Sequence, residues 1–387
     1  MRVPGALLIA TLLVGCGADA GGDAPCAEPA ALDGLRLNEL QVIGSHNSYR
    51  RRMYAPLFAF VQGLQGLQPE LSPSTLDYEH LPLAEQLDAY GVRALELDLY
   101  NDPEGGRFYE RKGLAFIEEP TSSNLPELRQ PGLKVLHIPD FDYETHHLTF
   151  RGALAAIRAW SDAHPGHLPL FIQLETKEST VADALMGVQI DLTTAVPFDA
   201  AAVAAIDAEI REVFTEPARL VTPDDVRGAH ATLEEAVLAG AWPLVSDARG
   251  RVMFFMEGPA VDDYLAAAPT LAGRVVFPLG EPGQPHAAFV LRNDSTAVAA
   301  ITDLVERGYI VRTQADSGTD EARSGDTTRL RNALRAGAQI VSTDYYRPDP
   351  RGAQSGSGWT NYKAALPGGG PARTNPVNGG APRRLCQ

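Results

Sequence analysis

The sequence contains few cysteines, little positive charge and no long hydrophobic run after its first residues. Three cysteines occur among 387 residues, and their spacing does not match a Cys-based zinc site. No later apolar run approaches the ~20 residues that a membrane-spanning helix needs. Lysine and arginine total 33 against 49 acidic residues, a formal net charge of −16. This charge argues against nucleic acid as a partner, so an anionic ligand must be met locally by a metal ion or a few placed cations.

Two common catalytic motifs are also absent. The sequence has neither a phosphate loop of the P-loop type nor a Gly-x-Ser-x-Gly nucleophile elbow. It does have ample apolar material, since 44% of its residues are hydrophobic and 21% are charged. That composition is typical of a globular protein with a large core, and the length allows either two average domains or one α/β barrel.

The N-terminal segment reads as an export signal. Arg2 is followed by the apolar run 6–14, and Leu13-Val14-Gly15-Cys16 resembles a bacterial lipobox. We therefore expect a signal peptide over residues 1–15, lipidation of Cys16 and a linker over residues 16–30. The protein would be an exported, membrane-anchored lipoprotein of the outer membrane or cell surface. The alternative is an ordinary signal peptide and a secreted protein.

The two remaining cysteines lie near the ends of the mature chain. Export places Cys26 and Cys386 in an oxidising compartment, where thiols form disulfides. We expect these two residues to pair, which would tie the start of the domain to its last residues. Two free thiols are the alternative.

From Leu37 to Tyr345, short apolar runs alternate with amphipathic stretches, as strands and helices do when they take turns. Five stretches predict helices: Leu83–Tyr90, Thr149–Ala163, Asp199–Phe214, Thr296–Arg307 and Thr327–Ala336. The apolar runs predict eight strands: Leu40–Gly44, Ala94–Leu99, Lys134–Ile138, Leu170–Leu174, Arg251–Phe255, Val275–Phe277, Tyr309–Thr313 and Gln339–Ser342.

Eight strands with intervening helices predict the α/β class and a distorted (β/α)8 barrel of the TIM type over residues 31–345. Chemistry in such barrels takes place at the carboxyl ends of the strands. Long polar connections over 48–82 and 101–132 would shape access to that face. Residues 346–387 are rich in glycine and proline and predict an extended C-terminal strap, which Trp359 and Tyr362 would hold against the barrel.

The strongest local signal is a strand with two acids. In Ala94–Leu99 the alternation of a strand places Glu96 and Asp98 on one face and three leucines on the other. Two carboxylates on an interior barrel strand repel each other unless a cation or proton intervenes, so we expect a metal site. The alternative is a polar edge strand with solvated acids.

A second strand repeats this pattern. In the segment 170–177, Gln173, Glu175 and Lys177 share one face. Glu175 falls at the carboxyl end of the strand and can join Glu96 and Asp98 at one mouth of the barrel. Lys177 would either bind an anionic substrate or neutralise Glu175.

Histidines follow the first and third predicted strands. His46 and His137 suit general acid or base chemistry, because imidazole titrates near neutral pH. Asn47 offers a neutral oxygen of the kind that hard cations accept. Arg312 lies at the end of a later predicted strand and Tyr345 follows another, so both would line the mouth. The alternative for Arg312 is a salt bridge to an acid such as Asp316.

The ordered set His46-Asn47, Glu96-x-Asp98, His137 and Glu175 resembles the catalytic barrels of calcium-dependent phosphoinositide phospholipases C. The resemblance runs from about Leu37 to Tyr345 and points to a secreted bacterial member without the accessory domains of the eukaryotic enzymes. Its anchors are 44–49 (Gly-Ser-His-Asn-Ser-Tyr), 95–98 (Leu-Glu-Leu-Asp), 174–175 (Leu-Glu) and 341–345 (Val-Ser-Thr-Asp-Tyr).

The resemblance implies that Asn47, Glu96, Asp98 and Glu175 bind one Ca²⁺. It further implies that His46 meets a phosphate oxygen, that His137 protonates the leaving diacylglycerol, and that Glu96 or Glu175 takes the proton of the inositol 2-hydroxyl. The expected substrate is phosphatidylinositol, contacted by Lys177, Arg312 and Tyr345, and the expected product is a cyclic inositol phosphate. We expect a monomer that meets a membrane surface and binds no nucleic acid.

Two other functions compete with this one. A glycerophosphodiester phosphodiesterase or sphingomyelinase D-like enzyme would share the barrel, the paired acids and the two histidines. In the former, arginine typically follows the first histidine, whereas Asn47 stands here. A tethered lipid-binding lipoprotein without turnover is the other alternative, although pure binding does not need an acid and a base.

Overall fold

The computed structural model describes residues 26–65, 72–184, 191–381 and 383–385. Cys16 and Cys386 lie outside these residues, so lipidation and the disulfide stay predictions. Among the described residues, no helix has the length and apolar character needed to cross a membrane.

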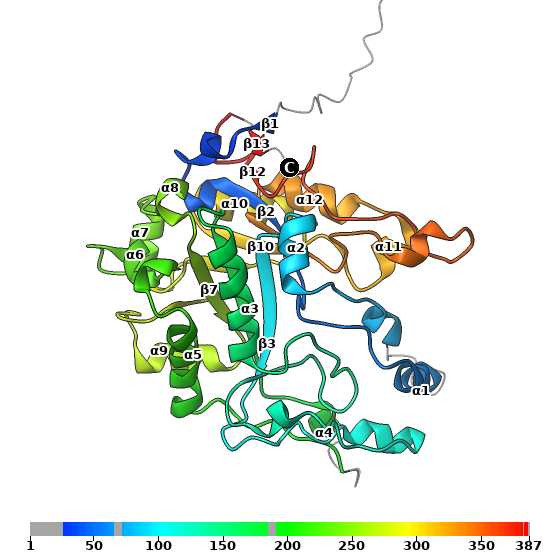
Figure 1. Ribbon diagram of the computed structural model, residues 1–387. Coiled ribbons are helices and arrows are strands. Elements are labelled where there is room, and N and C mark those ends of the chain that lie inside the picture. The colour runs from blue at the N-terminus through cyan, green and yellow to red at the C-terminus, as the bar shows by residue number, and fades with distance from the viewer. Residues whose placement is uncertain (1–25, 66–71, 185–190, 382, 386–387) are drawn as a thin grey trace, which may run out of the picture.

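The described part of the chain is built on a curled sheet of parallel strands (Figure 1). Each strand pairs with the next except β8 with β9, and the last one pairs with the first. A single parallel bridge between Leu279 and Phe289 joins β8 to β9. This is the distorted TIM-type barrel that the sequence predicts. In order, its strands are β2 (Leu40–Ser45), β3 (Ala94–Tyr100), β5 (Leu170–Lys177), β7 (Val252–Glu257), β8 (Val276–Pro278), β9 (Phe289–Leu291), β10 (Ile310–Gln314) and β11 (Ile340–Thr343).

The junction of β2 and β3 shows one source of the distortion. These strands share only the pair Gly44 and Ala94. A Cβ atom on Gly44 would lie 2.8 Å from the Cβ of Ala94, so glycine permits the close approach. The apolar faces of the barrel strands form the main core, together with the inner faces of the surrounding helices.

The third predicted strand is wrong in extent and direction. Only Lys134–Val135 (β4) is extended, and it pairs antiparallel with the carboxyl end of β3 through Leu99 and Tyr100. The ammonium of Lys134 points inward and lies 3.1 Å from Asp102. A barrel strand with an apolar inner face would not accommodate this buried ion pair. The segment that carries His137 therefore folds back beside the mouth. The barrel strand that the sequence analysis missed is the short strand β9.

The five predicted helices are all present, and two of them begin with a side-chain cap. Thr149 accepts a hydrogen bond from the amide of Gly152, and Asp199 accepts one from the amide of Ala202. The helices are α1 (Ala55–Gln65), α2 (Leu83–Ala89), α3 (Phe150–Ala163), α4 (Val181–Ala184), α5 (Ala200–Val213), α6 (Pro223–Arg227), α7 (Leu233–Leu238), α8 (Val245–Ala248), α9 (Ala260–Ala267), α10 (Val298–Glu306), α11 (Asp320–Ser324) and α12 (Thr328–Ala336).

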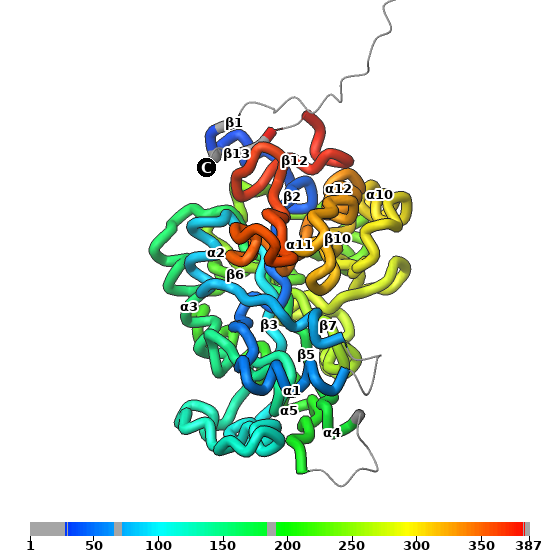
Figure 2. The backbone as a smooth tube through the Cα atoms, turned by 90° about the vertical axis from the view of Figure 1, so that its right-hand side faces the viewer, coloured from blue at the N-terminus to red at the C-terminus, as the bar shows by residue number. Residues whose placement is uncertain are grey.

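The start and end of the described chain lie side by side, as Figure 2 shows. Strand β12 (Arg373–Thr374) pairs antiparallel with β2, and β13 (Arg384–Leu385) joins both β12 and β1 (Cys26–Ala27). Strand β6 (Leu220–Val221) adds to the edge of β7. Between Tyr345 and β12 the strap follows the barrel surface. Trp359 and Tyr362 in this strap are buried in one aromatic cluster with Tyr78 and Tyr345.

Candidate active site

Four carboxylates meet at the carboxyl ends of three neighbouring strands. Glu96 and Asp98 come from β3, Glu175 from β5 and Glu257 from the last position of β7. Asp98 pairs in register with Glu175, which pairs with Glu257. One oxygen each of Glu96, Glu175 and Glu257 lies within 4.8 Å of the others. The β3 and β5 acids thus point into one mouth, and Glu257 joins them.

Asp98 is fully buried and lacks ordinary partners. Neither of its carboxylate oxygens accepts a hydrogen bond from a described residue, although the Lys177 ammonium lies 3.2 Å from Oδ2. The same ammonium lies 2.5 Å from Oε1 of Glu175. Burial raises the pKa of Asp98 to about 8, with the Glu175 and Glu96 charges adding to it and Lys177 opposing. Burial likewise raises the pKa of Glu257 to about 7, and the charge of Glu96 adds to that rise.

This donor set fits a hard divalent cation. All the candidate ligand atoms are oxygens, which Ca²⁺ prefers over nitrogen or sulfur. The four acids outnumber Lys177 and Arg312, the cations that pair with them. The crowding of carboxylates contributes to the raised pKa values of Asp98 and Glu257, which a bound divalent cation would lower. Asp98 gives such a cation a buried carboxylate whose described close partner is the Lys177 ammonium at 3.2 Å from Oδ2.

Arg312 is engaged inside the barrel. Its Nη2 atom lies 2.6 Å from Oε2 of Glu96 and 3.1 Å from Oγ of Ser342, and its Nη1 donates to Asn293. Its acidic partner is therefore Glu96, not Asp316. Tyr345, the third expected substrate contact, is 3% exposed within the aromatic cluster of the strap.

The loop after β2 is bonded directly to β3. Ser48 donates its amide to the carbonyl of Glu96 at 3.0 Å, and its hydroxyl accepts the amide of Glu96 at 2.8 Å. Asn47 has a φ of 48° in this turn, a left-handed conformation that asparagine tolerates better than most residues. Its Nδ2 donates to the hydroxyl of Tyr78 at 3.0 Å. This contact directs the amide nitrogen to Tyr78, so Oδ1, which accepts a hydrogen bond from the hydroxyl of Tyr49 at 3.4 Å, is the candidate ligand atom.

A carboxylate holds the ring of His46. Nδ1 lies 2.8 Å from Oδ1 of Asp344, and Nε2 lies 3.7 Å from Oε1 of Glu96. Burial lowers the pKa of His46, but the charges of Asp344 and Glu96 outweigh it and raise that pKa to about 9. The Nε2 atom is thus protonated at neutral pH and faces the acidic cluster.

His137 is held in the same manner from another segment. Its Nδ1 lies 2.8 Å from Oδ2 of Asp142. Burial lowers the pKa of His137, and the hydrogen bond to Asp142 opposes that effect. An ionised Asp142 can only accept a hydrogen bond, so Nδ1 of His137 carries a proton. Nε2 is then the nitrogen that gains or loses a proton when His137 titrates. Both histidines therefore offer Nε2 for chemistry.

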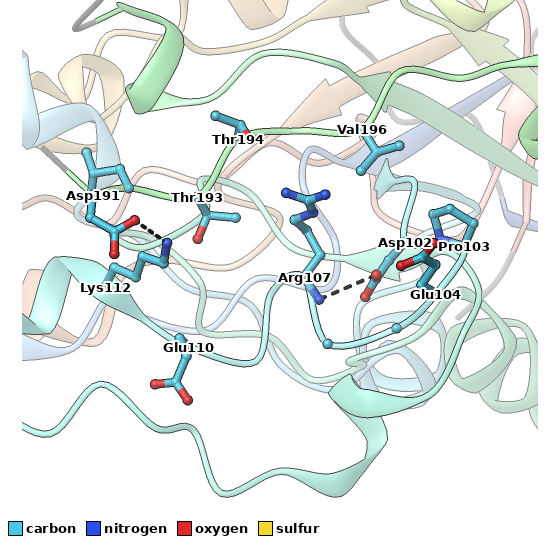
Figure 3. A pocket seen from close by; sticks show the side chains of 13 residues that line it. Asp102, Pro103, Glu104, Arg107, Glu110, Lys112, Asp191, Thr193, Thr194 and Val196 are labelled. Atoms are coloured by element: carbon cyan, nitrogen blue, oxygen red, sulfur yellow. Dashed lines mark hydrogen bonds and ion pairs between the residues drawn. The ribbon is translucent and has the colours of Figure 1, made fainter. Parts of the chain in front are cut away.

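A separate cavity lies away from these groups. A space of about 650 Å³ opens between the residues after β3 and the segment 191–196 (Figure 3). Lys112 on one wall is paired with Asp191 on the other at 2.5 Å. None of the four carboxylates or the two histidines lines it, so its volume does not mark the reactive centre.

Three site residues escaped the sequence analysis. Asp142 orients His137 from five positions away, and no local pattern signals that contact. Arg50 binds Asp142, and no local pattern signals this contact either. Glu257 is the last residue of β7, two residues beyond the end of the strand predicted over 251–255. The charged residue that follows the apolar run Val252–Met256 was the available signal.

A family model and solved structures match this chain. The family model described as "Phosphoinositide phospholipase C, Ca2+-dependent" matches residues 35–376. A Ca²⁺-dependent phosphoinositol-specific phospholipase C from a Gram-negative Pseudomonas species is 18% identical in sequence, with a TM-score of 0.51, and the match covers 87% of this chain and 98% of that chain. At that identity the likeness shows the fold. A Ca²⁺-dependent phosphatidylinositol-specific phospholipase C from Streptomyces antibioticus is 21% identical over 81% of this chain and 95% of that chain, with a TM-score of 0.48. No curated protein matches the sequence.

Proposed function

The chain belongs to the Ca²⁺-dependent phosphoinositide phospholipase C family of enzymes, and from that premise we propose that it cleaves phosphatidylinositol to diacylglycerol and a cyclic inositol phosphate. The observation that carries the proposal is the paired arrangement of the histidines. His46 and His137 each bind a carboxylate through Nδ1, at 2.8 Å, and keep Nε2 for the substrate. His46 does so beside the acidic cluster.

In the proposed reaction, the inositol 2-hydroxyl attacks the phosphorus atom. The new bond joins that oxygen to phosphorus, and the bond from phosphorus to the diacylglycerol oxygen breaks. His137 gives its Nε2 proton to the leaving oxygen, while Glu96 or Glu175 accepts the proton of the 2-hydroxyl. Protonated His46 donates to a phosphate oxygen and offsets the negative charge that grows in the transition state.

Asn47, Glu96, Asp98 and Glu175 would hold the Ca²⁺, with Glu257 as a further oxygen donor. When bound there, the ion would lower the pKa of the 2-hydroxyl and stabilise charge on the phosphate. Lys177 then serves to neutralise Asp98 and Glu175 rather than to bind substrate, because its ammonium already contacts both.

The charges at the mouth favour a head group without ring phosphates. The side chains of Lys177 and Arg312 are occupied by acids, and the ring of His46 is held by Asp344. Glu175 and Glu257 would repel a further phosphate on the inositol ring. We therefore expect phosphatidylinositol to be cleaved faster than its ring-phosphorylated forms.

An apolar surface supports access to a lipid substrate. Helix α1 has no charged residue, and of its side chains only Leu57 is fully buried. It packs against the 3-10 helix Lys112–Ile117, where the ring of Phe116 stacks on Phe60 at 5.5 Å and Phe141 at 6.0 Å. Both elements follow the carboxyl ends of barrel strands, and Figure 1 shows α1 at the periphery of the molecule. A net charge of −16 does not attract the protein to an anionic membrane, and apolar contact supplies another means of meeting it.

Phe116→Ser is expected to weaken attachment to phosphatidylcholine vesicles about tenfold, because Phe116 is 39% exposed and a buried aromatic ring contributes roughly 1.5–3 kcal/mol. Cleavage of a monomeric short-chain phosphatidylinositol should be unchanged. Vesicle sedimentation of the full chain, with Cys16→Ser in every variant to prevent acylation, measures the effect. Leu238→Ser on α7, at a position 51% exposed, is the matched control. Equal binding by both variants would remove the apolar surface from the proposal.

The function itself is tested by a substrate panel with the full chain. We expect calcium-dependent release of diacylglycerol and cyclic inositol phosphate from phosphatidylinositol, and its loss when a chelator removes the metal. Glycerophosphoinositol, sphingomyelin and lysophosphatidylcholine are the comparison substrates. Release of choline or of glycerol phosphate with magnesium would contradict the proposal. Binding of every lipid without turnover would contradict it as well.

A further inference from the structure

Arg50 is a fully buried arginine that the proposed reaction does not use. It lies four residues after His46, and its side chain and that of Asp142 are both 0% exposed. Its Nε donates to Oδ2 of Asp142 at 2.6 Å, and its two terminal nitrogens donate to the carbonyls of Tyr78 and Leu76. A guanidinium with all three nitrogens committed is held in one orientation.

The partner of Arg50 is also the partner of His137. The same oxygen, Oδ2 of Asp142, accepts from Nε of Arg50 and from Nδ1 of His137 at 2.8 Å. The other oxygen of Asp142 has no hydrogen-bond partner among the described residues. Arg50 thus keeps Asp142 ionised, since its charge lowers the pKa of that carboxyl although burial alone would raise it. An ionised Asp142 in turn keeps the proton on Nδ1 of His137.

Arg50 reaches the other histidine through Tyr78. Its guanidinium lies 4.2 Å from the centre of the Tyr78 ring. That ring is stacked with His46 at a centroid distance of 6.4 Å and an interplanar angle of 24°. The hydroxyl of Tyr78 accepts from Nδ2 of Asn47. One side chain therefore contacts the supports of both histidine-bearing loops.

The backbone joins the same two loops. Arg50 and Thr145 form an antiparallel bridge. The amide of Arg51 donates to the carbonyl of Glu144 at 3.1 Å, and the amide of His146 donates to the carbonyl of Tyr49 at 2.8 Å. Arg50 lies at the centre of this pairing, between the residues after β2 and those after β4.

We propose that Arg50 is a positioning residue that sets His46 and His137 relative to each other, through Tyr78 on one side and Asp142 on the other. The inference rests on the proposed roles of the two histidines. A residue that only fastened the two loops would affect stability alone. A positioning residue also changes the tautomer, the proton affinity and the orientation of the rings.

Arg50 acts through two arms, one from Asp142 to His137 and the other from Tyr78 to His46. Two substitutions separate these arms. Asp142→Asn removes the charge beside His137 and leaves Tyr78 in place. Arg50→Lys keeps a positive charge but cannot reach three acceptors at once, so it disturbs both arms. Asp207→Asn is the control, because Asp207 is a buried acceptor for Tyr264 at 2.6 Å and Arg274 at 3.0 Å and belongs to neither loop.

The experiment is nitrogen NMR of the full chain labelled in its nine histidines, with His137→Ala and His46→Ala used to assign the two rings. Besides Asp142, the charged groups acting on His137 are Arg50 and Lys177, which both oppose its protonation. Asp142→Asn should therefore lower the pKa of His137 by about one or more. It should shift only the His137 signals, whereas Arg50→Lys should shift those of both histidines.

Kinetics provide the second measurement. With a lower pKa, His137 would lose its acidic proton at a lower pH in Asp142→Asn. The fall in kcat on the alkaline side of the pH profile should therefore begin at a lower pH. At pH 8 we expect kcat to fall by about tenfold or more, with KM within about twofold, since an orienting carboxylate acts on the reacting histidine rather than on binding. Asp207→Asn should lower the thermal stability and leave both histidine signals and the pH profile unchanged.

Unchanged His46 signals in Arg50→Lys, or unchanged His137 titration in Asp142→Asn, would overturn the proposal. So would equal shifts in the Asp207→Asn control. The NMR measurement needs no substrate, so it decides the positioning role even if the chain cleaves no phosphatidylinositol. Should Arg50→Lys fail to fold, Asp142→Asn still tests the arm that reaches His137.

Discussion

Replacing His137 by alanine is expected to lower kcat for phosphatidylinositol by on the order of 10²–10⁴-fold. The diacylglycerol oxygen is a poor leaving group, and without the Nε2 proton of His137 it must depart as an alkoxide. KM should change little, because the proton moves only in the transition state. Initial rates on mixed micelles of detergent and phosphatidylinositol would measure both constants.

The nature of the leaving group provides a sharper form of this test. With a nitrophenyl ester of inositol phosphate the leaving oxygen needs no proton, so His137→Ala should lose far less activity on that substrate. His164→Ala is the matched control, because His164 is a histidine stacked on Trp160 on α3, away from the mouth. Equal losses on the two substrates would argue that His137 binds the phosphate and does not protonate the leaving group.

The second large effect is expected from Asp98→Asn. This change should abolish calcium-dependent activity and remove the rise in Tm that calcium produces in the unchanged protein. A bound ligand at 100 times its Kd stabilises a fold by about 2.7 kcal/mol, and that stabilisation should disappear. Without calcium the variant should be as stable as the parent or more so, because a buried carboxylate without hydrogen bonds is destabilising.

The pH dependence of stability in the metal-free protein provides a second test of Asp98. Burial raises the pKa of Asp98 in the folded chain to about 8, above its ordinary value of 3.8. Between these two values the folded chain holds a proton that the unfolded chain has lost, so the contribution of Asp98 to stability declines as pH rises through this window. The parent should show this decline, and Asp98→Asn should show a smaller one, because Glu257 and Asp316, whose pKa values are raised to about 7, also contribute to it.

Thermal unfolding with and without calcium at several pH values measures all of these effects. Asp140→Asn is the control, since Asp140 is a buried acceptor of hydrogen bonds from Lys112 and Thr193 outside the acidic cluster. That variant should lose stability and keep its calcium response. A calcium response retained by Asp98→Asn would place the metal on the other carboxylates, Glu96, Glu175 and Glu257.

Local patterns predicted the parts of the fold that lie within single segments. Alternation along Ala94–Leu99 and 170–177 identified which acids share a face, and Thr149 and Asp199 identified where two helices begin. The same approach failed for residues 134–138. An apolar run bounded by turn residues indicates an extended strand, but it does not specify the partner or the direction of pairing.

The sequence alone therefore determined the barrel class, the order His46-Asn47, Glu96-x-Asp98, His137 and Glu175, and the family that this order indicates. Only the tertiary structure decided which groups meet: Asp344 with His46 across 298 positions, Arg312 with Glu96 across 216, and Arg50 with Asp142 across 92. Such partners are chosen when the barrel closes and its loops pack. Burial then requires each charge to find a counter-charge, and the distance along the chain no longer limits the choice.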